Sequence, residues 1–114
     1  MILDALVSVA LVPDADRIPQ PSRSAPTAAV RLLRCVVNHE SRGNPRAENP
    51  RSTASGLFQF LDGTWRHYAK HVPSARKYRH AAHAPAATQW EVALLAVKWG
   101  GKHAWDGTHC AGVR

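Results

Sequence analysis

Several features are missing from this chain of 114 residues, and each absence excludes a class of protein. No uncharged apolar run approaches the roughly 18 residues that a membrane-spanning helix needs. No internal repeat is visible, which excludes solenoids and propellers. Acidic residues are few, because 8 Asp and Glu stand against 15 Lys and Arg. With 45% hydrophobic residues, the composition therefore predicts one small basic globular domain without room for a second core.

The positive charge belongs to the domain and not to a terminal tail. Beyond residue 28 the chain holds 13 Lys and Arg against 5 Asp and Glu. Such a surface favours a polyanionic partner: a nucleic acid, an anionic membrane or an acidic wall polymer. A nucleic-acid-binding module is the alternative from another functional class, but no recognised nucleic-acid motif accompanies the charge. We therefore expect no nucleic-acid partner and no membrane span.

The first 28 residues differ in composition from the rest. Residues 1–12 are apolar, but Asp4 interrupts them and they lack the basic start and small-residue cleavage site of a secretory signal, so we predict no signal peptide. Four prolines make residues 13–28 an extended linker. Residues 1–12 are then either a docking element for a larger assembly or a frayed terminus. The globular domain is expected over residues 29–114.

Apolar spacing predicts a first helix that ends near Glu40. Thr27 is a candidate N-cap, and Val30, Leu33 and Val37 recur at the spacing of one helical face. The following residues, 44–57, are rich in Pro, Asn, Ser and Thr, which predicts a long loop or a short hairpin.

Two further helices are expected in the second half of the chain. Asp62 is a candidate N-cap for one of them. Thr88 and Glu91 have the spacing of a capping box, in which each side chain accepts a hydrogen bond from the other residue's N–H. The helix that this box opens is apolar over residues 92–97 and ends at the Gly100–Gly101 pair. Because it is apolar on nearly every face, we expect it to be the buried central helix.

The two cysteines, Cys35 and Cys110, lie near the two ends of the domain. A disulfide between them would stabilise the fold by about 4 kcal/mol through the loop it closes. It would also imply an oxidising compartment. The alternative is two unrelated buried thiols.

Glu40 is the candidate catalytic residue, because it stands where an apolar helix ends before a Gly-containing loop. Partial burial raises the pKa of a carboxyl, which suits the general acid that glycoside cleavage requires. Gln59 and Thr64 are candidates for hydrogen bonds to sugar hydroxyl or N-acetyl groups. Flat apolar faces for sugar rings are offered by three tryptophans that are otherwise core residues, namely Trp65, Trp99 and Trp105.

The seven histidines suggest a metal site, which we judge to be the weaker interpretation. His67 and His71 have helical i, i+4 spacing, but no Glu follows His67 as in H-E-x-x-H, and the cysteines form no C-x-x-C pair. The histidines that would complete such a site are His80, His83, His103 and His109. We therefore expect no metal and no other cofactor.

Three ordered motifs resemble the signature of a known superfamily. They are Glu-Ser-x-Gly-Asn-Pro from Glu40, Ser-Gly-Leu-Phe-Gln-Phe from Ser55, and Gly-Thr-Trp from Gly63. Together they resemble lysozyme-like lytic transglycosylases, and specifically the resuscitation-promoting factor type. Residues 87–93 resemble that family's capped central helix, and Trp105 with Cys110 its closing Trp and disulfide. The resemblance covers residues 29–110.

This resemblance implies a small, mainly α (α+β lysozyme-like) fold that cleaves the β-1,4 bond between N-acetylmuramic acid and N-acetylglucosamine in peptidoglycan. Glu40 takes the position of the family's single acid/base, and Cys35 and Cys110 match its disulfide pair. No cofactor is implied. The substrate-binding candidates that follow from the motifs and from side-chain chemistry are Ser41, Ser55, Gln59, Thr64, Trp65 and Trp99.

A single carboxylate suits lytic transglycosylation. Glu40 would act as acid and then as base on the muramyl 6-hydroxyl, closing a 1,6-anhydro ring. If Glu48 is a second carboxylate, the protein is instead a muramidase that uses water. A non-catalytic module that binds the wall is a further alternative.

Three arginines close to Glu40 in sequence, Arg42, Arg46 and Arg51, oppose the effect of burial, since a nearby cation favours the carboxylate form. They either act in this way, bind the carboxylates of the glycan's lactyl and peptide groups, or form a solvated basic loop. We expect burial to dominate at Glu40.

The expected place of action is the cell wall, outside the cytoplasmic membrane. Without a signal peptide, delivery is expected from a virion or phage tail or by another export route. The N-terminal segment and linker, residues 1–28, would then join the enzyme to a virion or envelope assembly.

Overall fold

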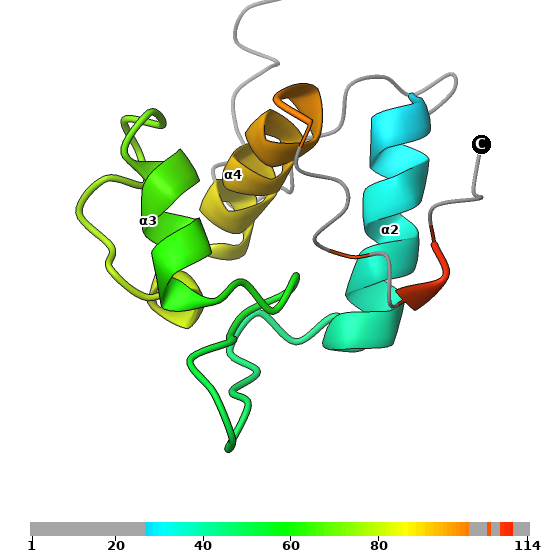
Figure 1. The fold of residues 1–114 in the computed structure, drawn as a ribbon, viewed down its shortest axis with the longest axis horizontal. Coiled ribbons are helices and arrows are strands. Elements are labelled where there is room, and N and C mark those ends of the chain that lie inside the picture. The colour runs from blue at the N-terminus through cyan, green and yellow to red at the C-terminus, as the bar shows by residue number, and fades with distance from the viewer. Residues whose placement is uncertain (1–26, 101–104, 106–107, 111–114) are drawn as a thin grey trace, which may run out of the picture.

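The structure, a computed structural model, describes residues 27–100, 105 and 108–110. The predicted docking element 1–12, residues 13–26 of the linker, Gly101 and His103 lie outside the described residues. Within them the chain forms three α-helices and one short 3₁₀ helix: α2 (Ala28–Glu40), α3 (Asp62–Ala69), η1 (Ala81–His83) and α4 (Ala86–Lys98). This small, mainly α domain confirms the predicted fold class (Figure 1). None of the described helices combines the length and apolar character that crossing a membrane requires.

Helix α4 is the central element of the domain. It packs against both α2 and α3 and lies between them in Figure 1. Val92, Ala93 and Ala96 are buried at these contacts. Leu94 and Leu95 are only partly buried, so the helix is covered on most sides but not on all of them. The expectation of a central helix is confirmed.

Helix α2 begins and ends where the sequence predicts. The Thr27 hydroxyl accepts a hydrogen bond from the Val30 N–H at 3.2 Å, which satisfies one of the unpaired donors at the helix start. Val30, Leu33 and Val36 are buried on one face. The last helical residue is Glu40.

The predicted starts of the other two helices are wrong. Asp62 is the first residue of α3 and not its N-cap, which is Leu61 and makes no side-chain capping bond. Helix α4 begins two residues before Thr88, after Pro85 as N-cap. Thr88 and Glu91 therefore form no capping box, and Glu91 instead accepts a hydrogen bond from the Ser74 hydroxyl at 2.6 Å. The fixed φ of proline starts this helix earlier than the polar pattern suggests.

Residues 41–61 form a long loop in place of a regular hairpin. Ser55 makes an isolated antiparallel bridge to Glu48 on one side and to Phe60 on the other. Pro45 and Pro50 lack the N–H that a longer ladder needs. Of the two predicted alternatives the long loop is the one observed, and strand pairing is limited to these isolated bridges.

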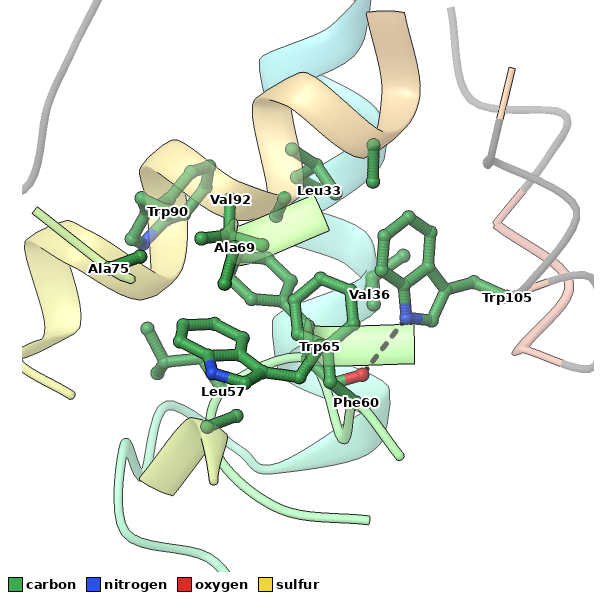
Figure 2. Close-up of a cluster of buried hydrophobic side chains, with 14 of the residues drawn as sticks. Leu33, Val36, Leu57, Phe60, Trp65, Ala69, Ala75, Trp90, Val92 and Trp105 are labelled. Atoms are coloured by element: carbon green, nitrogen blue, oxygen red, sulfur yellow. Dashed lines mark hydrogen bonds between the residues drawn. The ribbon is translucent and has the colours of Figure 1, made fainter. Parts of the chain in front are cut away.

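The core is an aromatic cluster that ties the loop to the helices (Figure 2). Phe58 is fully buried and packs edge-on against Trp90, with ring centroids 5.2 Å apart. The Trp105 indole N–H donates to the Phe58 carbonyl at 2.9 Å, and the Trp65 indole N–H donates to the Tyr78 carbonyl at 2.8 Å. Each ring therefore fixes a backbone segment as well as filling space.

A disulfide joins Cys35 in α2 to Cys110 near the end of the chain, as expected. Cys110 is fully buried. The bond holds the segment that carries Trp105 against α2, across 75 residues of sequence.

The side chain of Gln89 joins three loop segments from within α4. It is fully buried. Its Oε1 accepts from the Leu57 N–H at 2.7 Å, and its Nε2 donates to the carbonyls of Pro45 and Ala84 at 3.0 and 2.9 Å. Gly56, with φ of +80°, leaves the space for this amide, because a Cβ there would overlap the Gln89 amide oxygen.

Replacing this amide by an apolar side chain of similar length should be strongly destabilising. Gln89→Met leaves one buried N–H and two carbonyls without their partner, which should lower the free energy of unfolding by about 2 to 4 kcal/mol. Urea unfolding measures this. Asn38→Met, on the exposed face of α2, is the control and should change the value by less than about 0.5 kcal/mol. A loss below about 1 kcal/mol for Gln89→Met would contradict the assigned role.

Candidate active site

Glu40 is a half-buried carboxyl at the C-terminal end of α2. Within the described part of the chain, no group donates a hydrogen bond to it or pairs with it as a cation. The C-terminal end of a helix carries partial negative charge, which also disfavours a carboxylate there. Cations are the side chains usually favoured at a helix C-terminus. A carboxyl there without a hydrogen-bond or ion-pair partner is typical of a functional residue.

Burial raises the pKa of Glu40 above its ordinary value of 4.5, and the charge of neighbouring His39 lowers it. Desolvation is the larger effect, which confirms the expectation that burial dominates. The opposing cation is His39, so of the three alternatives left open for Arg42, Arg46 and Arg51, an effect on the Glu40 pKa is not supported. Those arginines lie exposed on the loop after the helix.

The turn after Glu40 is closed by Ser41. Its hydroxyl donates to the Val37 carbonyl at 3.2 Å and accepts from the Gly43 N–H at 3.2 Å. Arg42 and Gly43 both have positive φ, so the chain turns sharply away from the helix axis. In this structure the Ser41 hydroxyl therefore caps α2 and so fixes the end that carries Glu40.

Gln59 holds the polar loop together. It has φ of +52°, which is uncommon for a residue with a side chain. Its Nε2 donates to the carbonyls of Ala47 and Gly56 at 3.3 and 3.1 Å. Thr64, in the first turn of α3, is half-buried, and its hydroxyl makes no hydrogen bond to the described residues. The Oε1 atom of Gln59 and the hydroxyl of Thr64 therefore have no hydrogen-bond partner among the described residues.

Two of the predicted substrate-binding residues are core residues instead. Ser55 and Trp65 are both 0% exposed. The Ser55 hydroxyl accepts from the Ala82 N–H at 3.0 Å, and the Trp65 ring lies within the cluster of Figure 2. Trp105, considered as a ring platform, is also buried, at 4% exposure. A fully buried side chain presents neither a hydroxyl nor a ring face to a glycan, so the prediction of direct substrate contact is wrong for Ser55 and Trp65, and Trp105 offers no platform.

Trp99 is exposed but is not brought to Glu40. It follows the last residue of α4 and packs against His71 and Tyr68, with ring centroids 4.9 and 6.3 Å away. In Figure 1 this end of α4 and the Glu40 end of α2 lie at opposite ends of the domain. A role for Trp99 in binding substrate at Glu40 is not supported by this placement.

A histidine held between two carboxylates is a feature that sequence reasoning missed. His80 Nδ1 lies 2.7 Å from Asp62, and Nε2 lies 2.9 and 3.0 Å from the two oxygens of Glu48. The three residues come from separate segments, so no periodicity or motif signals their meeting. The hydrogen bond to Asp62 raises the pKa of His80 above 6.5, with Glu48 adding to the rise and partial burial opposing it.

Potential metal ligands gather at one place in the described residues, and it is not the one considered from the sequence. The group consists of Cys35, His39 and Cys110, whose sulfurs are joined in the disulfide. His67 lies in α3 and His71 lies just after its C-cap. No third potential metal ligand joins these two histidines among the described residues.

Comparison with known proteins identifies the family of the chain. The family described as "Transglycosylase SLT domain" matches residues 19–96, so the chain belongs to this family. The chain is similar to "Probable transglycosylase SceD" of Staphylococcus aureus strains Newman and USA300, at 34% identity over 90 residues. That alignment covers 76% of this chain and 38% of each relative, so the chain spans well under half the length of these relatives. No solved structure gives a significant match.

The His80 contacts should make stability depend on pH. Because the folded-state pKa of His80 is raised, its stabilisation is complete below 6.5 and is lost as the pH rises through the folded-state pKa. We expect the wild type to exceed His80→Gln in free energy of unfolding by up to about 1 kcal/mol at low pH, since Glu48 is exposed and screened. Urea unfolding of both proteins between pH 5 and 9, values spanning the ordinary His pKa, tests this. The difference should shrink with rising pH, and a constant or growing difference would contradict it.

Proposed function

We propose that this chain is a peptidoglycan-cleaving enzyme that breaks the bond between N-acetylmuramic acid and N-acetylglucosamine, with Glu40 as its single acid/base. The observation that carries the proposal is the half-buried, unpaired carboxyl of Glu40 with a raised pKa. Membership of the SLT transglycosylase family and the name of the staphylococcal relatives support the same reaction class.

The proposed reaction uses Glu40 twice. The protonated carboxyl first donates its proton to the leaving glycosidic oxygen as the sugar ring gains positive charge. The resulting carboxylate then removes the proton of the muramyl 6-hydroxyl, whose oxygen closes a 1,6-anhydro ring. Gln59 and Thr64 are proposed to hydrogen bond to the substrate. Ser41 is proposed to contribute by holding the end of α2.

The alternative of a muramidase requires a second carboxylate to activate water. Glu48 is the candidate, but both of its carboxylate oxygens lie at hydrogen-bond distance from His80. This engagement favours Glu48 as a structural partner of His80 and the one-carboxylate mechanism. A non-catalytic wall-binding module is the remaining alternative, and the retained Glu40 argues against it.

The biological setting is part of the proposal. We propose action at the cell wall, outside the cytoplasmic membrane. The order of motifs favours the resuscitation-promoting factor type of domain. Delivery by a phage or virion, with residues 1–28 attached to a larger assembly, stays a prediction from the composition of that segment.

Glu40→Gln should abolish most activity without harming the fold. General acid catalysis contributes about 10² to 10⁴-fold, so turnover of purified peptidoglycan should fall by that factor. Since a raised folded-state pKa means that ionised Glu40 destabilises the fold, the variant should also be at least as stable as wild type at pH 7. Glu91→Gln, an exposed carboxyl bonded to Ser74, is the matched control and should keep full activity. Equal turnover by Glu40→Gln would remove Glu40 as the acid.

Mass spectrometry of the released fragments separates the two reaction types. Products that end in 1,6-anhydromuramyl groups are expected, and reducing muramyl ends would instead indicate a muramidase. In the latter case Glu48→Gln should lose activity, whereas under the transglycosylase proposal it should retain most of it. Release of no fragments from several wall types would favour the binding module.

The pH dependence of turnover should report the Glu40 pKa. Because the acid must be protonated, kcat/KM should fall as the pH rises through a pKa that lies above 4.5. Initial rates on solubilised glycan strands over a pH series give this midpoint. A profile without a group that titrates above the ordinary Glu value would contradict the assigned environment of Glu40.

A further inference from the structure

A cleft lined by basic side chains lies between α3 and the segment that follows it, and Glu40 is not among its lining residues. Its volume is about 240 Å³, and its lining residues are Arg66, Ala69, Lys70, Arg76, Tyr78 and Arg79. The lining residues belong to the second half of α3, its C-cap and the segment after it, whereas Glu40 ends α2, so the cleft and the candidate catalytic residue are formed by different segments. The proposed reaction makes no use of this cleft.

The fold brings these basic groups together from two segments. Arg66 and Lys70 stand one turn apart on α3 and its C-cap. The segment that carries Arg76 and Arg79 is fixed against α3, because the buried Trp65 indole donates to the Tyr78 carbonyl at 2.8 Å. The hydrogen bond therefore fixes the two backbone segments relative to each other, and the four basic side chains extend from them as exposed groups around the cleft.

No acidic side chain offsets this charge in the part of the chain that the structure describes. That part contains four carboxylates. Glu48 and Asp62 bond to His80, Glu91 accepts from Ser74, and Glu40 ends α2. None of them lines the cleft, and none forms an ion pair with its four cations.

Such an arrangement is unfavourable without a ligand. Like charges one helical turn apart destabilise a helix, and four cations around one small cavity repel one another. The favourable partner is an anion with several oxygens, because guanidinium groups donate paired hydrogen bonds to such groups. Tyr78, half-buried at the same cleft, adds a hydroxyl donor.

We propose that this cleft binds the phosphate groups of an anionic phosphodiester polymer of the cell wall, and so holds the enzyme on its substrate. The choice of a wall polymer rests on the proposed function. The choice of phosphate over carboxylate rests on the convergence of four cations on one cavity, which suits closely spaced phosphodiesters better than the separate carboxylates of peptides.

The test is a binding titration of the full chain with soluble poly(glycerol phosphate) at about 0.15 M salt, where unspecific surface attraction is screened. Arg66→Gln/Arg79→Gln removes two charges from the cleft. Arg46→Gln/Lys98→Gln removes two exposed charges elsewhere and is the matched control. Equal unfolding curves for the two variants establish that both are folded. The cleft variant should lose at least tenfold in affinity and show a weaker salt dependence, whereas the control should lose less than about threefold.

Three results would overturn the proposal: equal losses in both variants, no binding by wild type, or tighter binding of duplex DNA with the same sensitivity to the cleft variant. The assay contains no glycan and should give the same affinity for Glu40→Gln. Binding that persists while all variants fail to cleave peptidoglycan would support the cleft and reject the enzymatic proposal. Cleavage of peptidoglycan by wild type without binding of the polymer would support the enzymatic proposal and reject the role of the cleft.

Discussion

The buried amide of Gln89 is the interaction on which the rest of the domain depends. It extends from the central helix α4 and bonds to backbone groups of three otherwise separate segments, at Pro45, Leu57 and Ala84. The backbone bonds within the loop are turns and isolated bridges, so regular strand pairing does not fix its conformation. The amide gives hydrogen-bond partners to three backbone groups inside the core. Without them these buried groups would be unsatisfied, which costs free energy of folding. The polar loop next to Glu40 thereby gains a defined path.

The charged side chains discussed above form three separate groups. Glu48 and Asp62 are joined through His80, which links the polar loop to the start of α3 and to the segment before η1. Glu40 is left without such a partner at the end of α2, and burial keeps its pKa high. The basic cleft beside α3 has no carboxylate at all among the described residues. Glu40 and the cleft are thus two places where charged groups lack a partner of opposite charge among the described residues, and both are candidate functional sites.

The elements and the catalytic candidate were predictable, because local chemistry determines them. Periodic apolar residues place α2, and Thr27 caps it in the structure as predicted. Glu40 stands out because a carboxyl at the end of an apolar helix is unusual. The starts of α3 and α4 were not predictable from capping patterns, since Asp62 and Glu91 find partners in His80 and Ser74 that lie far away in sequence. The same limit explains why the sequence predicts substrate contacts for Ser55 and Trp65, which the fold buries.

The sequence by itself determined a small, basic, mainly α domain with Glu40 as its candidate acid/base, and its ordered motifs indicated the transglycosylase class. Those properties follow from composition, short-range spacing and residue type, which do not depend on long-range packing. Only the tertiary structure decided which polar side chains are buried or hydrogen-bonded within the fold and which stay accessible to a ligand. It buried Ser55 and Trp65, placed Trp99 away from Glu40 and gathered four cations at one cleft. Burial and pairing are properties of contacts between distant segments, and the chain encodes them only through the fold as a whole.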